Sequence, residues 1–285
     1  MLRTARRRLR HFRLAPAATI LLAAAATPAF AEFEIQESTI DPGEIQLQYR
    51  GAWHSGLPPA EAVADIDPLP GGEIEAVKQS HEFELQMSVT SRWLLAFTHA
   101  FEEPIADDFR PNAVEFESQI ELIERSGDGI GVAFQGGTER PLRDAADETD
   151  PDVHLGPIVE LSKSNFTLVT NPLFFKLHGD VNNQEGLGFE YGWQGRYEAM
   201  GGRLWLAVEM FGEVEDMSNA GGFNQQLHSL GPAFYYTFGK DDEDGGDEDI
   251  YEKSREFTVS LGAQFGLTDV TSDAALKVFL GYEFD

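Results

Sequence analysis

Apolar and polar residues alternate with a period of two along many long segments of this chain. In the stretch SHEFELQMSV (residues 80–89), four apolar residues fall on one parity and two glutamates on the other. Successive side chains of a β-strand point to opposite faces, so the pattern predicts strands with one apolar and one polar face. Twelve such segments follow one another, at residues 44–54, 80–89, 92–101, 113–123, 129–137, 153–162, 165–177, 186–198, 202–212, 228–239, 255–266 and 275–284.

The length of these segments favours a membrane environment over water. Most of these segments are longer than an average strand of a soluble protein, which has about 5–6 residues. Their length matches the roughly 9–11 residues of a tilted strand that crosses a bilayer. Long and short connections also alternate along the chain, as in barrels with long outer loops and short periplasmic turns. Hydrocarbon offers backbone groups no hydrogen bonds, so only a closed sheet is possible there. The predicted fold is all-β, a transmembrane antiparallel up-and-down β-barrel of about twelve strands.

The first residues of the chain predict export. Residues 1–14 are rich in arginine and contain no acid, and a short apolar run follows that ends in the A-x-A pattern at Ala29 and Ala31. This is the layout of a cleaved secretory signal peptide, here residues 1–31. The apolar run is shorter than the roughly 18 residues of a membrane-spanning helix.

The remaining chain divides into two predicted parts. Residues 32–43 are expected to form a periplasmic N-terminal segment, and residues 44–285 the barrel, which includes an acidic turn at 240–254 and a long loop at 55–79 that could fold over the mouth. The net charge of −28 becomes more negative without the leader, which excludes nucleic acid as a partner. No cysteine is present, so there is no disulfide framework or thiol chemistry.

Three prolines fall inside predicted strands, at Pro157, Pro172 and Pro232. A closed barrel has no edge strand to hold them, so each is expected to mark a bulge or a strand end. The apolar parity also changes along the stretch 165–177, which predicts one inserted residue near Pro172.

If the apolar face of each strand contacts lipid, the other face lines the lumen. That face carries more acids than bases, and carboxylate rings favour cations. We therefore predict a narrow passive channel for small molecules or cations, with a non-conducting structural or surface-interaction barrel as the alternative. The predicted lumen-facing residues are Glu82, Glu84, Arg92, Glu115, Glu117, Glu121, Glu190, Arg196, Arg203 and Glu209.

The end of the chain, VFLGYEF, together with the leader and the alternating strands, resembles Gram-negative outer-membrane β-barrel proteins. In that class the last strand carries an assembly signal for the barrel-insertion machinery, which implies this role for Leu276, Val278, Leu280, Tyr282 and Phe284. The resemblance implies a location in the outer membrane, with its lipid and the assembly machinery as partners. The LGP strands and the YYTFG continuation also look like the barrel family linked to meta-pathway phenol degradation, whose members are presumed small-molecule channels.

Catalysis finds little support in the sequence. The outer-membrane phospholipase and lipid A deacylase families place a histidine two positions before a nucleophilic serine, and no His-x-Ser occurs here. Metal binding lacks a cluster of the required spacing, and the acidic turn matches a calcium loop only in part. We predict no enzyme activity, no catalytic or metal residues and no cofactor, with a lipid-modifying barrel enzyme as the remaining alternative.

Overall fold

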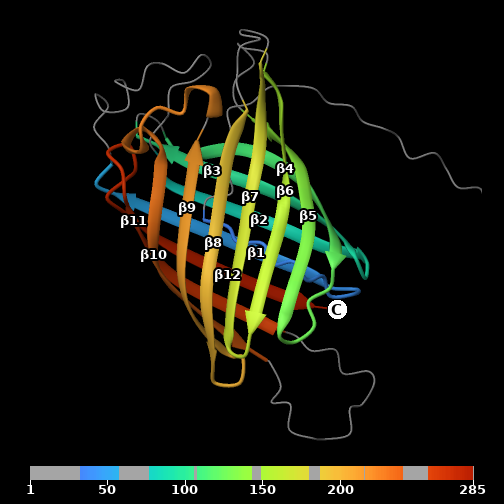
Figure 1. Ribbon diagram of the computed structural model, residues 1–285. Coiled ribbons are helices and arrows are strands. Elements are labelled where there is room, and N and C mark those ends of the chain that lie inside the picture. Colours follow the sequence, from blue (N-terminus) through green and yellow to red (C-terminus); the bar gives the residue numbers. More distant parts are fainter. Residues whose placement is uncertain are drawn as a thin grey trace, which may run out of the picture.

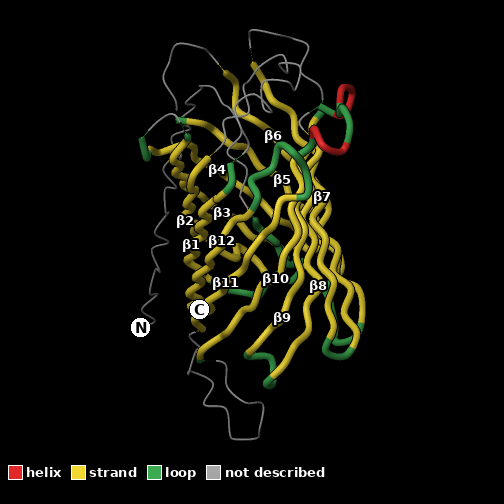
Figure 2. Tube along the Cα trace, turned by 90° about the vertical axis from the view of Figure 1, so that its left-hand side faces the viewer, coloured by secondary structure: helices red, strands yellow, loops and turns green. Residues whose placement is uncertain are grey.

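The computed structural model describes residues 33–57, 77–105, 108–142, 149–179, 187–214, 216–239 and 256–284. These residues form a closed antiparallel barrel in which each strand pairs with its neighbours in sequence (Figures 1 and 2). The prediction of a twelve-strand up-and-down barrel is confirmed. The strands are β1 (Ile45–Ser55), β2 (Val77–Thr90), β3 (Trp93–Pro104), β4 (Arg110–Ile123), β5 (Gly129–Pro141), β6 (Thr149–Lys163), β7 (Phe166–Gly179), β8 (Gly188–Ala199), β9 (Leu204–Val214), β10 (Leu227–Phe238), β11 (Glu256–Gly266) and β12 (Ala274–Phe284); two short 3-10 turns, η1 (Met217–Asn219) and η2 (Phe223–Gln225), precede β10.

The barrel closes between its first and last strands. β1 pairs with β12 along its whole length, from Ile45 opposite Phe284 to Ser55 opposite Ala274. The five residues expected to carry the assembly signal share the parity of Leu276 and Tyr282, which are exposed on the outer face. The seam therefore leaves no unpaired edge where the chain ends.

The two faces of the sheet are inverted relative to a soluble protein. On β2, Phe83 is 54% exposed on the outside while its neighbour Glu84 is 3% exposed on the inside. The other strands repeat this arrangement, with large apolar side chains outward and polar or small ones inward. Among the described residues, no helix is long and apolar enough to span a membrane. An apolar outer band over a polar interior is the architecture of an outer-membrane β-barrel.

The two ends of the barrel differ in their connections. Connections after β2, β4, β6 and β8, at 91–92, 124–128, 164–165 and 200–203, are short, and we call this rim the turn end; the connection after β10, at 239–255, is longer. Connections after odd-numbered strands form the opposite rim, the loop end. The predicted signal peptide, most of loop 55–79 and the predicted acidic turn 240–254 lie outside the described residues.

Pro157, Pro172 and Pro232 do not shift the register, so the bulges predicted at these three positions are wrong. The pairing of β7 with β8 runs through Pro172 without interruption, and that of β9 with β10 runs through Pro232. Instead, Pro157 and Pro172 lie opposite each other, and the β6–β7 ladder skips these positions before it resumes in the same register. Neither proline has an N–H to donate, so placing the two together confines the lost hydrogen bonds to one gap.

The predicted change of parity on β7 is also absent. Because the register is continuous, Phe175 keeps the inward parity of Val169 and Asn171, and its side chain is buried. Its ring occupies the space that a side chain at Gly188 would need, since a Cβ there would lie 2.1 Å from the ring. The large apolar residue is therefore accommodated inside the barrel by a facing glycine.

Candidate functional site

Most residues predicted to line the lumen lie on the inner face. Glu82, Glu84, Glu121, Arg196 and Glu209 are buried there. Glu115, Glu117 and Glu190 share the inward parity of their strands and are partly exposed. Arg92 and Arg203 differ, because both belong to connections at the turn end, and Arg92 is exposed.

Residues 33–43, which we call the N-terminal segment, run inside the barrel as far as Ile40, and residues 41–43 are exposed where the segment joins β1. A periplasmic segment was predicted for residues 32–43, whereas residues 33–40 contact the inner wall of the barrel. Asn171 accepts a hydrogen bond from the Gln36 N–H (2.6 Å) and donates one to the Gln36 carbonyl (2.9 Å). The Ser38 and Ile40 N–H groups donate to Glu160 (3.3 Å) and Glu121 (3.2 Å). Side chains of the wall thus satisfy backbone groups that would otherwise be buried without partners.

Ion pairs also hold this segment. Arg50 on β1 contacts Glu34 of the segment at 2.6 Å and the wall residues Glu82 (2.9 Å) and Glu84 (2.7 Å). Arg196 on β8 pairs with Glu37. The two arginines therefore attach the segment to opposite parts of the wall.

Inward-facing glycines make room for the segment. A Cβ at Gly131 would lie 2.2 Å from the Ser38 hydroxyl, and a Cβ at Gly192 would lie 2.8 Å from Ile35. Ile35 also packs against the buried wall residues Ala133, Ile158 and Val169. The interior surface thus fits the segment in shape as well as in hydrogen bonding.

The wall from β8 to β12 is filled by a network around Glu209. This carboxylate is fully buried and accepts hydrogen bonds from Tyr235, from Gln194 (2.7 Å) and from Lys277 (2.6 Å). Lys277 also donates to the Phe33 carbonyl at 3.2 Å. Side chains and the N-terminal segment together narrow the middle of the lumen.

Carboxylates outnumber bases on the inner wall. Arg50, Arg196 and Lys277 are buried bases of the described strands, and each already pairs with acids. Two partly exposed bases, Arg110 and Arg125, pair with the inward-facing Glu102 and Glu160. The inward-facing acids of the described strands include Glu82, Glu84, Glu102, Glu115, Glu117, Glu121, Glu139, Glu160, Glu190 and Glu209. The narrow interior therefore has a negative charge that the described bases do not balance.

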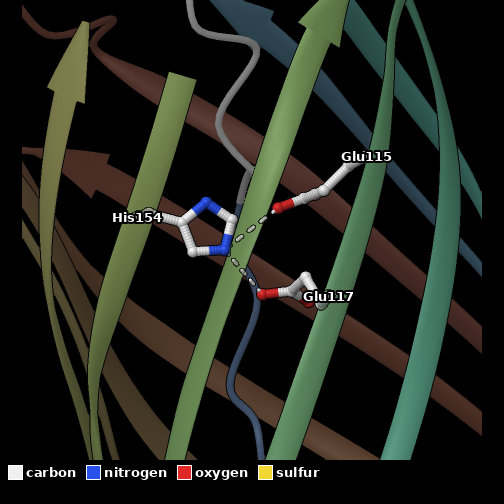
Figure 3. Close-up of side chains that lie close together, drawn as sticks. All are labelled: Glu115, Glu117 and His154. Carbon is white, nitrogen blue, oxygen red and sulfur yellow. Dashed lines mark hydrogen bonds and ion pairs between the residues drawn. The ribbon is translucent and has the colours of Figure 1, made fainter. Parts of the chain in front are cut away.

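One group of these inward-facing carboxylates lies beside a histidine. His154 Nε2 on β6 lies 3.0 Å from a Glu117 oxygen and 3.4 Å from a Glu115 oxygen, both on β4, and the ring points between the two carboxylates (Figure 3). Gly137 on β5 pairs with Glu117 on one side and His154 on the other. A Cβ at Gly137 would lie 2.6 Å from His154 Nε2. The glycine therefore allows the imidazole to reach across an intervening strand.

Sequence reasoning missed several of these residues. His154, Asn171 and Gln119 are not among the residues predicted to line the lumen, although Gln119 donates to the Glu37 carbonyl at 2.8 Å. Inward parity was the available signal, because His154 alternates with the outward Val153 and Leu155. The alternation of side chains predicts which residues face the lumen. It does not predict which of them contact a segment that lies inside the lumen.

A histidine and a serine meet at the loop end without the spacing sought in the sequence. His54 Nδ1 lies 2.9 Å from the Ser272 hydroxyl, which belongs to the connection between β11 and β12. The His54 ring also stacks on Phe33, with ring centroids 6.0 Å apart. The contact attaches a connection and the N-terminal segment to β1; nucleophilic catalysis would further require a group that orients the base.

Comparisons with known proteins give a fold likeness alone. No protein-family model matches the chain, and no curated protein matches it. Among solved structures, it is similar to the KdgM porin in complex with disordered oligogalacturonate (TM-score 0.47, 6% identity, covering 84% of this chain and 98% of that one). It is also similar to outer membrane phospholipase A from Escherichia coli (TM-score 0.39, 12% identity, 90% and 94% covered) and to OccK5 from Pseudomonas aeruginosa (TM-score 0.37, 11% identity, 73% and 59% covered). These scores assign no function, and the fold stands on the strand pairing and the apolar outer face described above.

Proposed function

We propose that this protein is a channel of the Gram-negative outer membrane that passes small cations or small cationic molecules, and that the N-terminal segment closes it at rest. The observation that carries the proposal is the carboxylate surplus on the inner wall. A narrow lumen with low-dielectric walls strengthens the field of such a surplus, and carboxylate rings select cations.

The closed state follows from the burial of groups that would face water in an open pore. Glu160 and Glu209 have an exposed fraction of 0% although both lie on the inner face. Glu160 is covered by Ser38 of the N-terminal segment, whose hydroxyl donates to it at 3.0 Å. Withdrawal of the segment would uncover this carboxylate and others on the same wall.

Deletion of residues 33–40 tests the proposal most directly. The purified variant, shown to be folded by faster migration on unboiled gels, should conduct more current in planar bilayers than the parent. The current should be carried by cations, as shown by the reversal potential in a salt gradient. A folded deletion variant that does not conduct, or that prefers anions, would contradict the proposal.

A reversible tether gives a sharper version of the same test. The Cβ of Ser38 lies 3.3 Å from the position of a Cβ at Gly131, close to the roughly 3.5–4.5 Å of a disulfide. The chain has no cysteine of its own, so Ser38→Cys with Gly131→Cys adds a single possible bridge. Reducing agent should raise the conductance of the double variant and leave that of Ser38→Cys alone unchanged.

The carboxylates near His154 provide the selectivity test. Glu115→Gln with Glu117→Gln should lower the preference for cations, because both side chains face the lumen and Gln keeps their size. Glu198→Gln with Glu256→Gln is the charge-matched control at the turn end, where the lumen meets bulk solvent. An equal change in both double variants would show that total charge, not the inner wall, sets selectivity.

The alternative function is a non-conducting structural barrel, and the same burial of Glu160 and Glu209 favours it. Removal of the N-terminal segment distinguishes the two functions. A channel should then conduct, whereas a structural barrel should remain closed by the side chains of its wall. The likeness to the phenol-degradation barrel family, and with it any particular substrate, stays a prediction from the sequence.

A further inference from the structure

The cluster of Glu115, Glu117 and His154 has the geometry of a metal site. One ligand atom from each residue lies within 4.8 Å of the other two. A tetrahedral zinc ion with bonds of about 2.0–2.1 Å holds its ligand atoms roughly 3.3 Å apart. The distances from His154 Nε2 to the two carboxylates, 3.0 Å and 3.4 Å, bracket that separation.

The donor set favours a transition metal over calcium or magnesium. Calcium and magnesium take oxygen ligands, whereas one imidazole nitrogen with two carboxylates suits zinc and its neighbours. Three protein ligands leave a position open toward the lumen for water. The fully buried Phe175 lies opposite His154 across the β6–β7 pair and forms an apolar wall beside the site.

Charge distinguishes this cluster from the other acidic group nearby. Glu34, Glu84 and Glu117 also approach one another, but Arg50 already pairs with Glu34 and Glu84. Among the ion pairs of the described residues, Glu115 and Glu117 have only His154 as a partner. Glu139 lies opposite Glu115 on β5 and adds a further carboxylate at the same level of the wall. A divalent cation bound between Glu115 and Glu117 would supply positive charge to both carboxylates.

We propose that Glu115, Glu117 and His154 bind a divalent transition-metal ion, zinc by preference, in the lumen. The inference deepens the proposed cation channel by naming a class of cation that its wall would hold. Gly137 is part of the site, because only a residue without a side chain leaves the imidazole in reach of both carboxylates.

Zinc binding to the purified full-length mature protein, after removal of any affinity tag, tests the inference. Titration with ZnCl₂ should show a saturable site that magnesium and calcium do not occupy. His154→Gln, and separately Glu115→Gln with Glu117→Gln, should weaken binding at least about tenfold, because loss of a supporting group alone costs roughly 10–100-fold. His99→Gln, a histidine on the outer face of β3, and Glu198→Gln with Glu256→Gln are the matched controls and should bind zinc as the parent does.

Copper provides a readout that does not depend on comparing affinities. Electron paramagnetic resonance of the parent protein with one equivalent of Cu²⁺ should show coupling to an imidazole nitrogen, and His154→Gln should abolish it. Absence of a zinc site, or binding and nitrogen coupling that persist in His154→Gln, would overturn the inference. Reversal potentials in KCl test the channel separately, so cation selectivity without zinc binding would overturn the metal site alone.

Discussion

Replacement of Arg50 by glutamine should destabilise the barrel strongly, because one buried guanidinium serves three carboxylates. Its nitrogens lie 2.6 Å from Glu34, 2.9 Å from Glu82 and 2.7 Å from Glu84, and its side chain is 7% exposed. Glutamine retains hydrogen-bond donors but removes the charge. The three carboxylates would then face one another in a nearly dry interior.

The size of the effect follows from the cost of leaving a buried charge without its partner, about 3–5 kcal/mol for one broken pair. An exposed pair contributes only about 0–1 kcal/mol. We therefore expect Arg50→Gln to lower the free energy of unfolding by about 3–5 kcal/mol near neutral pH.

Urea unfolding of the refolded protein in lipid vesicles, followed by tryptophan fluorescence, measures this difference. Arg110→Gln is a suitable control, since that arginine contacts Glu102 at 3.1 Å and is 26% exposed, and its loss should cost less. Glu84→Gln in the Arg50→Gln background should restore part of the stability. A loss below about 1 kcal/mol for Arg50→Gln would refute the argument, because it would mean that water or protons already neutralise these carboxylates.

Three further outcomes are expected. Tyr282→Ala with Phe284→Ala should lower the amount of protein in the outer membrane, as measured by fractionation, before any change in channel properties; normal levels would mean that these residues are ordinary lipid-facing aromatics. Phe83→Arg, on the outer face near mid-strand, should destabilise the barrel by about 2–4 kcal/mol in the same urea assay, and a neutral effect would argue against lipid at that position. Ser272→Ala should leave hydrolysis of a p-nitrophenyl ester at the background level of the parent; activity in the parent that the variant loses would make the His54 contact catalytic.

The sequence predicts the outer face of the barrel well, because lipid imposes a simple rule on it. On β2 the outward positions from Phe83 to Val89 are all apolar, and this alternation, with the length of the strand, identifies the strand, its faces and its membrane setting. The inner face follows no such rule. Phe175 is apolar yet points inward, because Gly188 has no side chain and leaves space for the ring. A pattern based on polarity wrongly assigns Phe175 to the lipid-facing side.

Local sequence patterns could not predict which side chains meet inside the lumen, for a different reason. Gln36 and Asn171 are 135 residues apart in sequence, and nothing in the neighbourhood of either one indicates the other. The same holds for Glu117 and His154, which meet across Gly137 only because three strands align in one register. The alternation predicted which carboxylates face inward, but their partners depend on the closed barrel.

The N-terminal segment has a consequence for the order in which the protein is built. It contacts Arg50 on β1, Asn171 on β7, Arg196 on β8 and Lys277 on β12, so its binding surface comes together only when strands from both ends of the chain have met. The segment precedes β1 and is therefore made first, yet we expect it to take up its final position among the last events of assembly. Until then we expect Glu121 and Glu160, which bind its backbone, to face water, so that the lumen of an assembling barrel is lined by carboxylates that the finished barrel covers.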